Sequence, residues 1–228
     1  MDEITVSTKN MSTGSLFAPG NTIAWKHLSE LNWPWEAIPL IASYIKELGT
    51  GLDENEYEAR PGNVWIHKTA AIAPSAHIGS NIIIGAETEV RHCAFIRSNA
   101  IIGSNAVIGN STELKNVILF DGVQVPHFNY VGDSILGYKS HLGAGAISSN
   151  CKSDHSLISV FCDSEIIETG LKKFGAILGD NVEVGCNAVL NPGTVIGSGS
   201  TVYPLLPVRG FIPANSIYKN PGEIVKKR

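Results

Sequence analysis

Aliphatic residues recur at every sixth position along the middle of the chain. An uninterrupted run consists of Ile72, Ile78, Ile84, Val90, Ile96, Ile102, Ile108, Leu114 and Phe120. The register returns at Leu136 and Leu142, and again at Leu178, Val184, Leu190, Ile196 and Val202. Neither a helix nor a single strand repeats every six residues, whereas three short strands per turn of a solenoid do. The pattern therefore predicts an all-β solenoid whose sixth-residue side chains point inward.

Glycine and small residues accompany this repeat. Glycine follows many of the aliphatic positions, as at Gly79, Gly85 and Gly109, and alanine stands two positions before others, as at Ala94 and Ala106. A chain turns most easily at a tight corner where it has no Cβ. We therefore expect thin strands that meet at crowded corners.

The pattern resembles the hexapeptide-repeat family of left-handed parallel β-helices. About 18 residues form one coil in that family, so residues 63–210 would supply roughly seven coils. A right-handed β-helix or another β-solenoid is the alternative. The ends of such a solenoid expose unpaired strand edges, which have to be capped or paired.

The two ends of the chain differ from the repeat. Residues 1–62 contain three of the four tryptophans, and their apolar residues from Leu28 to Leu48 approximate a helical stripe that Pro34 and Pro39 interrupt. This segment predicts one or two short helices, which either cap the first coil or contact another subunit. A substrate-binding lid is the alternative. Residues 211–228 are expected to form a C-terminal tail.

The repeat is interrupted twice. Between Phe120 and Leu136 the six-residue register slips by four residues, which predicts an excursion at 121–133. The second interruption, 149–176, contains the alternating segment SLISVFCDSEIIET, which is typical of a protruding hairpin. Insertions in solenoids often carry the binding function.

Composition excludes several classes of protein. A formal net charge of −4 and a pI near 6.0 provide no basic surface for a nucleic acid. The chain has no run of eighteen apolar residues and begins without a leader-like segment, so we expect a cytoplasmic protein with no membrane partner. The four cysteines are far apart, and His127, His141 and His155 stand fourteen residues apart, a spacing that does not indicate a metal site.

Three motifs make the resemblance more specific. ELKN at 113–116, PHFNYVGD at 126–133 and LGAGAISSN at 142–150 are similar to the acetyltransferase domain of the bifunctional N-acetylglucosamine-1-phosphate uridyltransferase/glucosamine-1-phosphate acetyltransferase family. The excursion that ends in TGLKKFGAILGDNVEVG more closely resembles archaeal sugar-1-phosphate nucleotidylyltransferases that carry an amino-sugar acetyltransferase domain.

The resemblance implies a coenzyme-A-dependent N-acetyltransferase with acetyl-CoA as co-substrate. Its acceptor would be an amino-sugar phosphate, such as glucosamine-1-phosphate, or a nucleotide-linked amino sugar. Such enzymes are homotrimers with clefts between neighbouring prisms, and the reaction needs no metal. Attack of an amine on a thioester requires a base, donors for the oxyanion and anchors for the anionic groups.

The resemblance assigns these roles to individual residues. His127 is the expected base and Glu113 the carboxylate that orients it. The expected substrate contacts are Arg97, Lys115, Tyr130, Asn150 and Lys173, with Lys172 as a neighbour. The expected contacts with acetyl-CoA are the backbone around Gly143, Ala144 and Gly145, together with Cys186. Lys226, Lys227 and Arg228 could meet the phosphates of the coenzyme.

Two other functions remain open. Cys151 stands where the family usually has a tyrosine, so the protein could be a non-catalytic, trimeric sugar-nucleotide-binding subunit. It could also be classed by similarity as a UDP-N-acetylglucosamine pyrophosphorylase although it lacks that chemistry. Uridylyl transfer requires a glycine-rich phosphate loop on a doubly wound sheet, which the first 62 residues do not provide.

Overall fold

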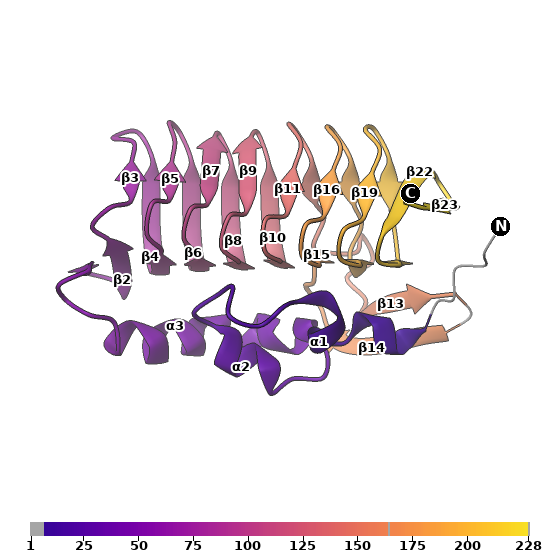
Figure 1. Cartoon of the computed structure of the whole chain (residues 1–228), viewed down its shortest axis with the longest axis horizontal. Helices are drawn as coiled ribbons and strands as arrows, with labels where there is room; N and C mark the ends of the chain where they lie inside the picture. Colours follow the sequence, from indigo (N-terminus) through magenta and orange to yellow (C-terminus); the bar gives the residue numbers. More distant parts are fainter. Residues whose placement is uncertain (1–6, 164, 228) are drawn as a thin grey trace.

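The computed structural model describes residues 7–163 and 165–227, which form a left-handed parallel β-helix flanked by short helices (Figure 1). The predicted fold class is confirmed. Three flat faces, here called faces 1, 2 and 3, make up the prism. Register pairs such as Ile96↔Leu114 and Val90↔Ile108 stack equivalent positions of successive coils.

The strands divide among the faces as follows. Face 1 contains β2 (Val64–His67), the second halves of β4 (His77–Ile84), β6 (Phe95–Ile102), β8 (Glu113–Leu119) and β10 (Tyr130–Leu136), then β15 (Ala176–Leu178), β18 (Thr194–Ile196) and β21 (Phe211–Ile212). Face 2 contains β3 (Ala71–Ile72), β5 (Glu89–Val90), β7 (Val107–Asn110), β9 (Gln124–His127), β11 (His141–Leu142), β16 (Glu183–Val184), β19 (Thr201–Val202) and β22 (Ser216–Asn220). Face 3 contains the first halves of β4, β6, β8 and β10, then β12 (Ile147–Ser148), β17 (Val189–Leu190) and β20 (Pro207–Val208).

The remaining elements lie outside the prism or at its ends. They are η1 (Thr8–Met11), α1 (Thr13–Leu16), α2 (Trp25–Ser29), η2 (Pro34–Leu40), α3 (Ile41–Thr50), β1 (Tyr57–Arg60), β13 (Ile158–Cys162), β14 (Glu165–Leu171) and β23 (Glu223–Lys226). The short helices expected before residue 62 and the hairpin expected within 149–176 are therefore present. β1 pairs antiparallel with β2 at the first coil, and β23 pairs antiparallel with β22 at the last, so one strand edge at each end of the solenoid is paired.

The predicted excursion at 121–133 is wrong. Residues of this segment belong to β9 and β10, which pair in parallel with β7 and β8. Leu119, rather than Phe120, stacks on Ile102, and Leu136 stacks in turn on Leu119. Two corners are each one residue shorter than the corresponding corners of the other coils. In a six-residue repeat, the loss of two residues shifts the register by the same amount as the insertion of four. The 121–133 segment therefore remains within the prism.

The predicted C-terminal tail also continues the solenoid. β21 pairs with β18 on face 1, and β22 pairs with β19 on face 2. Within the described residues, eight strands run parallel on face 2, from β3 to β22, so the solenoid is longer than the expected seven coils. Lys227 Nζ donates to Gly199 O at 3.0 Å, whereas Arg228 lies outside the described residues.

The helical part of the N-terminal segment, residues 7–50, runs along face 1, and only β1 lies at the edge of the first coil, where the cap was expected. Figure 1 shows α3 beside the first coils, with the β13–β14 hairpin beside the later ones. Outward-facing Ile83, Ile101 and Ile118 are fully buried beneath α3 and η2. Further along the same face, Phe17 packs on Phe120 with ring centroids 4.8 Å apart. Face 1 is therefore covered by the chain itself.

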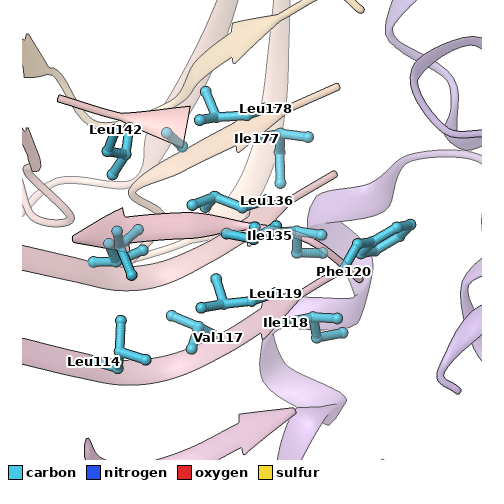
Figure 2. Packing of buried hydrophobic residues seen from close by; sticks show 14 of the residues in the cluster. Leu114, Val117, Ile118, Leu119, Phe120, Ile135, Leu136, Leu142, Ile177 and Leu178 are labelled. Carbon is cyan, nitrogen blue, oxygen red and sulfur yellow. The ribbon is translucent and has the colours of Figure 1, made fainter. Parts of the chain in front are cut away.

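The interior contains most of the repeat residues that the sequence predicts, with Leu119 in place of Phe120. Figure 2 shows Leu119, Leu136 and Leu178 stacked on one another, with Ile118 and Phe120 on the side of the N-terminal ribbon. All five side chains have at most 1% of their surface exposed. Burial of each side chain of this size contributes about 1.5–3 kcal/mol, so the stacked core is the main source of stability.

The glycines after the aliphatic positions are needed for a different reason from the one expected. Most left-handed corner positions are occupied by other residues, including Asn81, Asn99 and Asn105. A Cβ on Gly85 would instead lie 2.6 Å from the backbone of Gly103 in the next coil, and a Cβ on Gly109 would overlap the backbone of Pro126. Close stacking of coils, more than corner conformation, excludes a side chain at these positions.

We expect Gly109→Ala to destabilise the solenoid by about 1–3 kcal/mol because the added methyl group meets rigid backbone. Gly14→Ala is the matched control, since a Cβ on Gly14 in α1 would meet nothing within 4 Å. The control should be neutral or slightly stabilising. Urea unfolding monitored by circular dichroism measures both, and equal stabilities of the two variants would contradict the packing explanation.

Candidate functional site

The candidate site is a polar cluster on face 3, where that face meets face 1. The two shortened corners lie here, with Asn116 and Asp133 in the left-handed backbone region at φ 56° and 48°. Parallel pairing places Tyr130 beside Glu113 and Gly132 beside Lys115. The two shortened corners thus bring the motif residues of consecutive coils together.

Asp133 is the centre of this cluster. Its side chain is 4% exposed, and both carboxylate oxygens accept hydrogen bonds from Lys115 Nζ at 3.0 Å. Asn116 Nδ2 donates to Oδ1 at 2.9 Å, and Asn150 Nδ2 donates to Oδ2 at 2.5 Å. Asp133 was not among the predicted site residues. Its position in the PHFNYVGD motif was the available signal, but the motif does not indicate that the carboxylate is buried.

Tyr130 and Asn150, the predicted sugar contacts, are adjacent. Asn150 Nδ2 donates to Tyr130 Oη at 3.2 Å. Burial raises the pKa of the Tyr130 phenol, and the charges of Asp133 and Glu113 raise it further, so the hydroxyl stays protonated at neutral pH. A Cβ on Gly132 would lie 2.5 Å from Tyr130 Oη and 2.8 Å from Asn150 Nδ2. The glycine therefore leaves room for this pair.

Arg97 and Glu113 form an ion pair at the exposed edge of the cluster. Arg97 Nη1 lies 2.9 Å from Glu113 Oε1, with side-chain exposures of 47% and 33%. The hydrogen bond to Glu113 raises the pKa of Arg97, which remains charged. An exposed pair of this kind contributes little to stability and exchanges readily with other partners. The resemblance implied that Glu113 orients His127. The structure pairs Glu113 with Arg97 instead.

His127 lies at the end of β9, on the corner between faces 2 and 3. Its imidazole is exposed and has no hydrogen-bond partner within 7–163 and 165–227. Its backbone N–H donates to Asn129 Oδ1 at 3.1 Å, and the buried Asn129 donates in turn to Gly143 O at 2.9 Å. Asn129 therefore holds the corner in place while the histidine ring stays accessible.

The predicted coenzyme contacts stack on the same corner. Gly145 N donates to His127 O at 3.0 Å and Gly143 N donates to Val184 O at 2.7 Å, so two of the three candidate N–H groups are already paired. The Ala144 N–H has no protein acceptor among the described residues. Cys186 is exposed one coil further on, with its backbone N 2.7 Å from the position of a Cβ on Gly143. Ala144 therefore provides the one available oxyanion donor of the three.

Lys173 follows the hairpin, next to a residue whose backbone bonds to the cluster. The side chain is exposed, and the next residue, Phe174, donates from its backbone N to Asn150 O at 3.0 Å. Phe174 also packs on Trp35 of η2, with ring centroids 5.8 Å apart. Asn116 Nδ2 donates to Ile38 O at 3.1 Å. The N-terminal segment therefore forms a wall beside the cluster, and Lys172 is an exposed neighbour.

Two further features of the site concern metals and thiols. Cys151, next to Asn150, has its Sγ 3.6 Å from His155 Nδ1. Across the described residues, no three or more His, Cys, Asp and Glu side chains gather where they could hold a metal ion. No helix of that same part of the chain has both the length and the apolar character needed to cross a membrane.

Comparisons with known proteins agree with the motifs. The bifunctional protein GlmU of Methanococcus maripaludis strain C5 is 30% identical over 204 residues, which cover 88% of this chain and 49% of the relative. The bifunctional sugar-1-phosphate nucleotidylyltransferase/acetyltransferase of Sulfurisphaera tokodaii is 34% identical over 92 residues, covering 40% of this chain and 23% of the relative. The chain thus spans about half the length of the Methanococcus relative.

Among solved structures, a hexapeptide transferase family protein from Anaplasma phagocytophilum aligns over 72% of this chain and 79% of its own. The sequence identity is 15% and the TM-score 0.43.

The resemblance to bifunctional nucleotidylyltransferase/acetyltransferase proteins is confirmed by the sequence relatives. The family model described as the GMPPB C-terminal domain matches residues 87–202, just over half of the 228 residues. The chain therefore belongs to the GMPPB C-terminal domain family.

Proposed function

We propose that this protein transfers an acetyl group from acetyl-CoA to the amino group of an amino-sugar phosphate or a nucleotide-linked amino sugar. The observation that carries the proposal is the cluster around buried Asp133, which presents Tyr130, Asn150 and Arg97 on one face beside the corner of His127. The names of the relatives, which include a sugar-1-phosphate nucleotidylyltransferase/acetyltransferase, support the same chemistry.

The proposed roles follow from exposure and pairing. The exposed His127 takes the proton of the amine as its nitrogen attacks the thioester, and the unpaired Ala144 N–H stabilises the oxyanion. Tyr130 and Asn150 bind the sugar. Arg97 leaves Glu113 to meet the phosphate, with Lys173 as a second cation. Lys115 is held in a partly buried ion pair with Asp133, so it positions the site and does not serve as the free phosphate anchor that the resemblance implied.

We further propose that the active form is a homotrimer. The chain covers face 1, whereas large apolar side chains remain exposed on face 3 and on its corner with face 2. These residues are Phe95, Phe128, Ile147, Val189, Tyr203 and Leu205, each at least 37% exposed. A patch of this kind supports a contact with another chain, and flat faces suit a ring of parallel prisms.

A cytoplasmic location stays a prediction.

A non-catalytic, sugar-nucleotide-binding subunit is the second candidate. Two observations favour it: Glu113 does not orient His127, and Cys151 provides a thiol where the resemblance leads us to expect an aromatic ring. In that case the cluster would bind its ligand without turnover.

Turnover and binding assays separate the two functions. We expect release of the coenzyme A thiol from acetyl-CoA in the presence of glucosamine-1-phosphate, without added metal. Isothermal titration with acetyl-CoA, glucosamine-1-phosphate and UDP-GlcNAc reports binding. Affinity for UDP-GlcNAc without turnover of any amino-sugar phosphate would replace the enzyme by the binding subunit.

A further inference from the structure

A histidine–carboxylate pair lies on face 2, outside the cluster described above. His141 on β11 and Glu183 on β16 are aligned in register, and His141 Nδ1 lies 2.8 Å from Glu183 Oε2. A carboxylate at Nδ1 fixes the orientation of the ring and favours the tautomer whose Nε2 carries a free lone pair. The pair therefore has the geometry of an oriented proton acceptor, which His127 lacks.

The pair lines a polar groove of about 480 Å³. Gln124 on the preceding coil and Asn181 at the corner also line it. The charged groups that face His141 are Glu183 and Lys139, whose Nζ lies 5.0 Å from the centre of the Tyr138 ring. His141 is 35% exposed, so its ring is accessible from the groove. A ligand hydroxyl or amine would find both donors and acceptors here.

The cover on face 1 determines which surfaces two copies can bring together. Since α3, η2 and the hairpin occupy face 1, a neighbouring prism reaches only faces 2 and 3. In a closed ring whose axis is parallel to the prisms, each contact joins two different surfaces. Face 2 of one copy then meets face 3 of the next, which carries the Asp133 cluster.

The His141–Glu183 pair and the Asp133 cluster also lie at a similar height along the prism axis. β10, which begins at Tyr130, continues through one corner directly into β11, which begins at His141. Asn150 follows β12, which stacks on the start of β10 one coil further on, so His141 lies between Tyr130 and Asn150 along the prism axis. Rotation about an axis parallel to the prism does not change height. His141 of one copy therefore lies at a height between those of Tyr130 and Asn150 of its neighbour.

We propose that His141, oriented by Glu183, is a proton acceptor that acts on the amine held by the Asp133 cluster of a neighbouring copy. This rests on the proposed acetyl transfer. An amino sugar that binds as its ammonium form must lose one proton before attack and a second as the C–N bond forms. His141 takes the first proton and returns it to solvent. His127 takes the second and passes it to the coenzyme A sulfur as the C–S bond breaks.

The pH dependence of His141→Gln tests the chemical role. Below the pKa of the substrate amine, kcat/KM should fall roughly 10- to 100-fold relative to the wild type, and the deficit should shrink as pH rises and the free amine becomes abundant. Glu183→Gln should show the same trend more weakly. Matched controls are Glu89→Gln, at the same register on face 2, and His92→Gln. A deficit of constant size at all pH values would overturn the proposal, since a merely structural residue gives that result.

Mixed trimers test whether His141 acts on a neighbouring copy. Arg97→Ala disables the cluster and His141→Gln disables the acceptor, so each variant alone should have low activity. Refolding the two variants together at equal amounts should restore about one quarter of wild-type activity. With random assembly, one subunit contact in four joins a chain with intact Arg97 to a neighbour with intact His141. No recovery would place both groups in one chain and overturn the trans arrangement. An inactive wild type would instead refute the proposed function, so the two failures are distinguishable.

Discussion

Replacing Asp133 with alanine is expected to destabilise the protein by about 3–5 kcal/mol, since it leaves a largely buried ammonium group without its counter-ion. The Lys115 side chain is 21% exposed, and both of its hydrogen bonds to Asp133 would be lost. Asn116 and Asn150 would each lose an acceptor as well. Urea unfolding followed by circular dichroism measures the loss.

Two further variants show whether the buried charge causes this effect. Asp133→Asn keeps an acceptor but removes the charge, so its stability should lie between those of the wild type and Asp133→Ala. The double variant Asp133→Ala/Lys115→Met removes both charges and should recover part of the loss. A double variant less stable than Asp133→Ala alone would show that packing, and not the unpaired ammonium, dominates.

His127→Ala is expected to lower the rate of acetyl transfer by about 10²–10⁴-fold, the usual effect of removing a general base. Its free energy of unfolding should change by less than about 0.5 kcal/mol, because the exposed imidazole has no hydrogen-bond partner to lose among residues 7–163 and 165–227. A steady-state assay of thiol release, combined with urea unfolding, measures the two effects.

The chain offers a matched control for this variant. His92 occupies the equivalent corner position two coils earlier: Ser111 N bonds to His92 O, Phe128 N to Asn110 O and Gly145 N to His127 O. His92→Ala should therefore leave turnover at the wild-type level. Wild-type turnover in His127→Ala as well would remove His127 as the base, whereas loss of folding would make it a structural residue.

The repeat and the motifs specify much of this protein by local rules. A side chain at every sixth position is buried because three strands per coil return the chain to the same interior line, so the sequence predicts the β-helix and most of its core. The alternating segment within 149–176 similarly predicts the hairpin that β13 and β14 form. The resemblance names Arg97, Glu113, Tyr130 and Asn150, which the structure brings onto one face.

The register of the central coils was not decided by periodicity. A slip of four residues between Phe120 and Leu136 equals two single deletions in a six-residue repeat, and only pairing between coils distinguishes them. The structure shows Leu119 paired with Ile102 and Leu136 paired with Leu119. The deletions shorten the corners at Asn116 and Asp133 and thereby build the cluster that an excursion would have dispersed.

The sequence by itself determined the solenoid, its inward-facing residues and the motif that carries His127, because each depends on positions close together in the chain. Only the tertiary structure decided which polar groups pair: Glu113 with Arg97, buried Asp133 with Lys115, and His141 with Glu183. It also placed residues 7–50 along face 1. The ion pairs and the position of residues 7–50 on face 1 depend on which outward-facing side chains meet across coils and between segments far apart in the chain. A local sequence pattern does not determine which of these side chains come into contact.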